Sequence, residues 1–181
     1  MLNGCGSFME CNWILFPNSL RPIDELKRLA AVFDAHMDEI SSDFCNLKSD
    51  DVLAVVEDDL KSIGYSVERG KKAENLICMP VLFGERGNSE KGFNVDAYHP
   101  GVNIVLEVEA GRAVANNQFL KDLFEACMMN DAEYLCIAVR KQYSSGKIIS
   151  RDYEKVCTFI RTLYSSDRLT LPLKGVMVLG Y

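Results

Sequence analysis

The sequence predicts a mixed α/β fold in which helices cover a central sheet. Segments with helical apolar periodicity alternate along the chain with short apolar runs of strand length. One of these runs, EYLCIAVR at residues 133–140, is typical of a central strand covered on both faces. The order is two helices, three or four strands, a helix, a strand, a helix and a strand. This order favours layers of helix and sheet.

The helices are predicted from apolar residues that recur every three or four positions. Pro22 suits a first helical turn, and Ser49 or Asp50 suits the cap of a second helix that ends at Gly64. The predicted helices cover approximately residues 22–42, 49–63, 114–129 and 151–164.

The predicted strands are shorter and are separated by polar stretches. Trp13–Phe16 is either a short strand or a packing anchor. The remaining strands are predicted at residues 65–68, 75–83, 133–140 and 175–179, with a hairpin at 92–112. Residues 84–91 and 141–150 are predicted to be polar loops, the first of them rich in glycine.

The 181 residues are predicted to form a single domain, 1–181. Within it we expect an N-terminal helix pair at about 22–64, a core at about 65–140, and a C-terminal helix and strand at about 141–181. No apolar run approaches the ~20 residues needed to cross a bilayer, and the N-terminus lacks the features of a signal peptide. We therefore expect no membrane contact.

The seven cysteines are scattered and include no C-x-x-C pair, which favours free thiols in a reduced, cytoplasmic compartment over a zinc cluster. The net charge of -6 argues against a surface that coats nucleic acid. The acidic excess lies in residues 1–90, so a polyanionic partner is expected to meet the second half of the chain.

Gly92–Arg112 contains the main candidate site. Its two apolar strands are joined by a Pro-Gly turn at Pro100, and they carry Asp96, Glu107 and Glu109. Side chains alternate along a strand, so both glutamates share one face. With a loop of even length, Asp96 joins them at roughly 5–8 Å across the strands. Carboxylates this close repel one another unless a cation lies between them.

This pattern resembles the PD-(D/E)xK, or restriction-endonuclease-like, nucleases over roughly residues 50–140. That family has an α-β-β-β-α-β core with an acidic residue on the second strand and an acid-x-lysine motif on the third. Asp96 matches the first position and Glu107-Val108-Glu109 the second, with Glu109 in place of the usual lysine. The Glu-x-Glu variant also occurs in BamHI-like members.

The resemblance implies Mg²⁺ (or Mn²⁺) held by Asp96, Glu107 and the carbonyl of Val108, because hard cations prefer oxygen ligands. It implies that Glu109 orients or deprotonates the attacking water. Glu57, on the helix before these strands, resembles an additional acid that reaches the metal through water.

The helix after the strands supplies the remaining candidates. Lys121 is a candidate for a catalytic lysine that has moved to this helix, and Asn117 lies one turn before it. Arg112 follows the carboxylate strand directly. Asn117 and Arg112 are expected to contact phosphate.

The implied function is Mg²⁺-dependent hydrolysis of nucleic acid, DNA in the first instance, by a homodimer formed through the N-terminal helix pair. Three alternatives stay open. The carboxylates are solvated on an exposed strand, the protein is an inactive binding or regulatory module with a nuclease-like fold, or it hydrolyses small phosphoesters.

Overall fold

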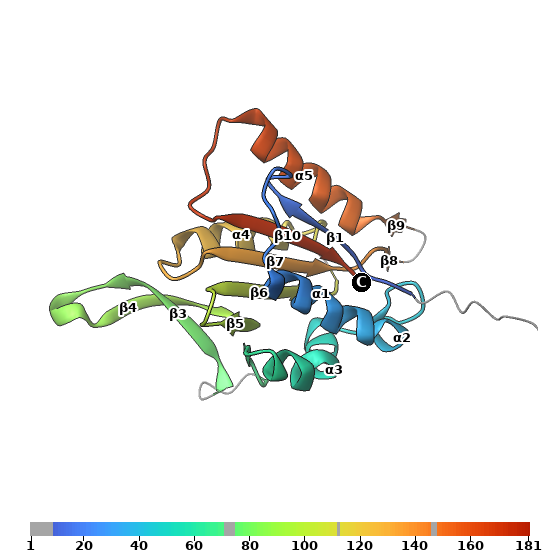
Figure 1. Cartoon of the computed structure of the whole chain (residues 1–181), viewed down its shortest axis with the longest axis horizontal. Helices are drawn as coiled ribbons and strands as arrows, with labels where there is room; N and C mark the ends of the chain where they lie inside the picture. Colours follow the sequence, from blue (N-terminus) through green and yellow to red (C-terminus); the bar gives the residue numbers. More distant parts are fainter. Residues whose placement is uncertain (1–8, 71–74, 112, 146–147) are drawn as a thin grey trace, which may run out of the picture.

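The centre of the molecule is a six-stranded mixed sheet, seen in a computed structural model that describes residues 9–70, 75–111, 113–145 and 148–181 (Figure 1). The neighbours β10–β7 and β7–β6 are parallel, and the other pairs are antiparallel. In spatial order the strands are β1 (Asn12–Phe16), β10 (Gly175–Gly180), β7 (Tyr134–Val139), β6 (Ile104–Glu109), β5 (Ala97–His99) and β2 (Ser66–Val67).

Helices cover both faces of this sheet, so the predicted mixed α/β class is confirmed. One face packs against α1 (Asp24–Ala35), α2 (Met37–Ile40) and α3 (Ser49–Ser62), and the other against α4 (Gln118–Met128) and α5 (Asp152–Ser166). Within the described ranges, no helix is long and apolar enough to cross a membrane.

Strand β6 shows how the two layers are separated. Leu106 and Val108 belong to the core beneath α1 and α3, whereas Val105 belongs to the core beneath α4 and α5. Every residue of β7 is buried, which confirms the expected central strand. The free thiols of Cys136 and Cys157 lie inside these two cores, as thiols in apolar patterns do.

Several boundaries differ from prediction. The helix expected at 22–42 is broken at His36 into α1 and α2. Helix α4 begins at Gln118 because Asn117 has a left-handed backbone, with φ 54°. The loop expected at 141–150 contains a short hairpin of β8 (Tyr143–Ser145) and β9 (Ile148–Ser150).

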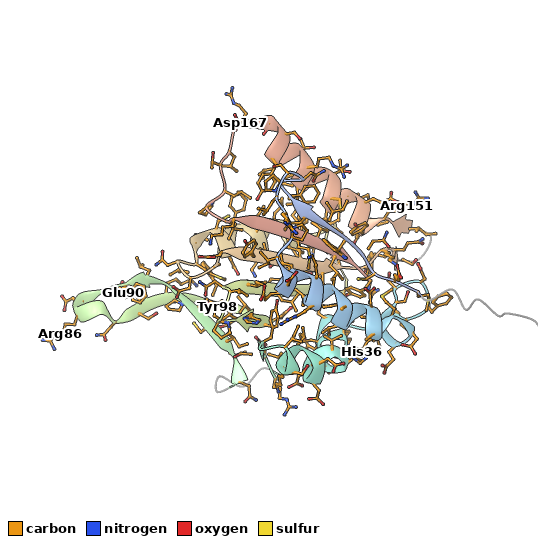
Figure 2. All side chains as sticks on the ribbon, in the orientation of Figure 1. His36, Arg86, Glu90, Tyr98, Arg151 and Asp167 are labelled. Carbon is orange, nitrogen blue, oxygen red and sulfur yellow. The ribbon has the colours of Figure 1, made fainter. Side chains whose placement is uncertain are left out.

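The largest correction concerns β3 (Ile77–Phe83) and β4 (Ser89–Val95). These strands pair only with each other, in a two-stranded sheet that extends away from the central one (Figure 1). The predicted loop at 84–91 is therefore shorter, because Ser89–Lys91 already pairs with β3. Its tight turn holds Arg86 in a left-handed conformation at the far end of this arm (Figure 2).

Candidate carboxylate site

Glu107 and Glu109 of β6 lie on the face of the sheet that α4 and α5 cover. They alternate with Val108, which packs into the opposite core, and they continue the face of Val105. Strands β5 and β6 form the expected antiparallel hairpin, in which Ala97 pairs with Leu106. Asp96, just before β5, continues this register opposite Glu107 and so belongs to the same face.

The Asp96 carboxylate completes the strand pairing at the point where β4 bends into β5. The backbone N–H of Val108 donates a hydrogen bond to Asp96 Oδ2 at 2.7 Å. In a strand, the N–H and C=O of one residue point toward the same neighbouring strand. The Val108 carbonyl therefore lies on the same side of β6 as Asp96.

Helix α4 contributes a further carboxylate that sequence analysis missed. Asp122 is 4% exposed and lies on the buried stripe of the helix, and its charge helps burial to raise the pKa of Glu109. Its Oδ2 atom has no hydrogen-bond partner among the described residues. The signal was present in the sequence, because Asp122 falls between Phe119 and Ala126 at the spacing of the apolar stripe.

The electrostatics of these four carboxylates are unfavourable when all of them are charged. Burial raises the pKa of Asp96 to about 6. Burial, together with the charges of Asp96 and Asp122, raises the pKa of Glu107 well above its ordinary value. For Glu109 and Asp122, burial is again the largest cause of a raised pKa, and for Glu109 the charge of Asp122 adds to it. The cluster therefore favours protonation or a bound cation.

A divalent cation suits the chemistry of this cluster. The donors are carboxylate oxygens and a backbone carbonyl, which Mg²⁺ prefers, and the buried Oδ2 atom of Asp122 has no hydrogen-bond partner in the described part of the chain. Throughout the described ranges, no three His, Cys, Asp or Glu side chains are already close enough to hold one metal ion. Three of these carboxylates could thus coordinate one ion only after their side chains move closer together.

Lys121 lies beside this cluster. Its Nζ atom is 3.8 Å from Asp122 Oδ1 and 3.3 Å from Glu125 Oε2, and its charge lowers the pKa of Glu107 and of Glu109. Asn117 is exposed at the N-terminus of α4, one turn earlier. Arg112 lies outside the described residues.

Glu57 is not brought to this group. It lies on α3, against the opposite face of the sheet, and forms ion pairs with Lys61 and Arg69. Burial acts to raise the pKa of Glu57, but the hydrogen bonds from these two cations outweigh it and lower the pKa.

One acid of α3, Asp50 in the first turn of the helix, acts on this region through its charge. After burial, that charge contributes to the raised pKa of Asp96. Burial is also the largest cause of the raised pKa of Glu68, which follows β2, and the charges of Asp96 and Asp50 add to it.

No protein-family model matches the chain, and no curated protein matches it. Among solved structures, the chain is similar to a crystal structure of free BglII, at 13% sequence identity and a TM-score of 0.45. That alignment covers 95% of this chain and 79% of the other.

Proposed function

We propose that this protein is a Mg²⁺-dependent phosphodiesterase that acts on nucleic acid through a restriction-endonuclease-like core. The observation that carries the proposal is the set of Asp96, Glu107, Glu109 and Asp122 on one face of the sheet. Their raised pKa values mark the excess negative charge that a divalent cation would neutralise.

The order of elements supports the same core. Helix α3 precedes β2, β5 and β6, and these are followed by α4 and β7. Strands β5 and β6 are antiparallel, and β6 and β7 are parallel. In this proposal the β3–β4 arm is an insertion between the first and second core strands.

Asp96, Glu107 and the Val108 carbonyl would hold the metal ion, with Asp122 as a further candidate ligand. A bound Mg²⁺ ion would lower the pKa of a coordinated water and neutralise charge that develops on the scissile phosphate. Glu109 would orient the attacking water and take up its proton. Lys121, on the exposed side of α4, would stabilise negative charge on the phosphate.

The substrate in this proposal is DNA, and the active form is a homodimer, because cutting both strands of a duplex favours two-fold symmetry. The helix pair at 22–64 was predicted to form the dimer contact. The apolar faces of α1 and α3 are buried against the sheet within one chain. A contact between two copies would therefore use the polar faces of these helices.

The test is cleavage of plasmid, linear and single-stranded DNA, and of RNA, with Mg²⁺ or Mn²⁺. Cleavage is expected to disappear in Asp96→Ala and Glu107→Ala. It should persist in Asp58→Ala, which removes an exposed carboxylate of α3. Activity that survives unchanged in the first two variants would exclude this site as the catalytic centre.

A second candidate function is a binding or regulatory module without catalysis. It is favoured by the Glu109 position, where the related nucleases carry lysine, and by the contact between Lys121 and Glu125, 3.3 Å apart. Titrations with Mg²⁺ and with Mn²⁺ separate the two functions. An ion that binds only the folded chain must raise its melting temperature. A melting temperature that neither Mg²⁺ nor Mn²⁺ changes would therefore favour the binding module.

A further inference from the structure

A second polar site lies at the carboxyl ends of β6 and β7, next to the carboxylate cluster. It is a cavity of about 500 Å³. Its lining comes from the segment before α3, from the ends of these two strands and from β8: Asn46, Lys48, Ser49, Ala110, Gly111, Arg140, Tyr143 and Ser144. Two residues of this lining are cationic, and none is acidic.

Arg140 is the buried cation of this cavity. The residue is only 6% exposed, yet among the described residues its guanidinium donates hydrogen bonds to neutral acceptors. These are Asn46 Oδ1, at 2.6 Å, and the carbonyl of Leu47. Within the described ranges, no carboxylate forms an ion pair with Arg140. A buried charge without a counter-ion is costly, so the fold keeps a cation here that an anion would stabilise.

The surroundings favour a phosphate group in particular. The guanidinium lies over the ring of Tyr143, 5.8 Å from its centroid. A planar guanidinium binds phosphate through paired hydrogen bonds. Lys48 adds a second, exposed positive charge at the start of α3. Ser49 Oγ accepts a hydrogen bond from the backbone N–H of Ala110 at 3.2 Å, so α3 and the end of β6 are joined at this cavity.

We propose that this cavity binds a phosphate group of a nucleic-acid strand, through Arg140 and Lys48. Ala110 and Gly111 of its wall directly follow Glu109, so the bound phosphate would neighbour the one held at the carboxylate cluster. This assignment to nucleic acid rests on the proposed function. The affinity of the cavity for phosphate does not, because it needs no metal ion and no cleavage.

The first experiment measures phosphate binding by calorimetry and thermal unfolding, in EDTA and at constant ionic strength against chloride. The wild type is expected to bind inorganic phosphate saturably, with a rise in melting temperature. Arg140→Met and Lys48→Gln should each weaken binding, by about tenfold for the arginine. Lys27→Gln removes an exposed charge that pairs with Asp24 on α1, and it should bind as the wild type does.

Ser144→Glu guards against a failure of Arg140→Met to fold. Ser144 is exposed at the rim, so a glutamate there should fold normally and repel phosphate. Equal phosphate binding by the wild type, Lys48→Gln and Ser144→Glu would overturn the proposal. Asp96→Asn should keep phosphate binding even though it abolishes cleavage, so that failure of the cavity and failure of the catalytic proposal are separate results.

The second experiment identifies the source of the phosphate with short oligonucleotides that carry a 5′-phosphate, a 3′-phosphate or neither. Tighter binding of one phosphorylated form, lost in Lys48→Gln, would assign the cavity to a strand end. Equal binding of all three, weakened alike in Lys48→Gln, would assign it to a backbone phosphate. Equal binding that Lys48→Gln and Ser144→Glu leave intact would exclude nucleic acid as the ligand of the cavity.

Discussion

The Asp96 side chain accepts a hydrogen bond from the backbone N–H of Val108 at 2.7 Å, at the bend between β4 and β5. The Asp96 carboxylate thus accepts a hydrogen bond from the backbone of β6 and also belongs to the candidate metal-binding cluster. Substitutions of Asp96 should separate its contribution to stability from its contribution to metal binding.

Asp96→Asn keeps an acceptor for the Val108 N–H and removes a buried charge, so its free energy of unfolding should be at least that of the wild type. Asp96→Ala leaves that N–H without a partner and should cost about 1–3 kcal/mol. Chemical denaturation in EDTA measures both. A similar loss in the two variants would mean that the hydrogen bond contributes little to stability.

The carboxylate cluster should make stability depend on pH in a specific direction. A raised pKa means that the folded chain binds more protons than the unfolded chain does, so stability falls as pH rises. For Asp96 this loss runs from pH 3.8 through about pH 6, and Glu107 extends it to higher pH.

Urea denaturation between pH 5 and 8 in EDTA should therefore give a falling free energy of unfolding. Saturating Mg²⁺ should flatten the decline, because the ion favours the charged carboxylates. Glu107→Gln should also reduce the decline without metal. A stability that rises over this range in EDTA and also in Glu107→Gln would contradict the assigned repulsion.

Asp122→Asn should separate stability from function. It removes one buried charge from the cluster and lowers the repulsion, so we expect a gain of about 1 kcal/mol in EDTA. The same change should reduce both stabilisation by Mg²⁺ and cleavage. Asp58→Asn, on the exposed side of α3, is the matched control and should change neither. A destabilised Asp122→Asn would contradict the assigned repulsion among the buried carboxylates.

His36 provides a test remote from the site. Its ring nitrogens lie 3.0 Å from Glu39 Oε1 and 2.8 Å from Asp59 Oδ2, at the junction of α1 and α2 (Figure 2). The hydrogen bond to Glu39 is the largest cause of its raised pKa. Burial opposes this cause, and Asp59 adds to it.

The stabilisation from His36 is fully present below its ordinary pKa of 6.5 and is lost as pH rises through the raised pKa. The difference in unfolding free energy between the wild type and His36→Gln should thus be about 0.3–1 kcal/mol at pH 5.5 and smaller at pH 8.5. The contribution of the carboxylate cluster is the same in both proteins at each pH, so it cancels from this difference in unfolding free energy. A constant difference would contradict the assigned ion pairs.

Local patterns were enough to predict most of the central sheet. The alternation along β6 separated Leu106 from Glu107, because a strand must send successive side chains to opposite faces. The uniformly apolar β7 was predicted to be a central strand because a strand that is covered on both faces has apolar side chains on both. The β3–β4 arm was not foreseen, since a strand has the same periodicity whether it pairs inside the main sheet or only with its neighbour.

The composition of the site was harder to predict because it depends on helix placement. The spacing of the apolar stripe on α4 places Asp122 at a buried position. Whether a carboxylate can be buried there depends on which groups of the neighbouring elements surround it, and a local pattern does not show them. Which acid of α3 acts on the cluster depends on how that helix packs on the sheet. The charge of Asp50, and not that of Glu57, contributes to the raised pKa of Asp96, and no local pattern distinguishes the two acids.

The position of β10 has a consequence for how the chain acquires its structure. β10 lies between β1 and β7, and its register pairs Gly180 with Asn12. Among the described strands, β1 pairs with β10 alone, so this pairing must wait until β10 has been synthesised. During translation, β1 and the β7 edge are exposed to chaperones and to other nascent chains. Pairing over so long a sequence separation should make completion of the sheet the slow step of folding.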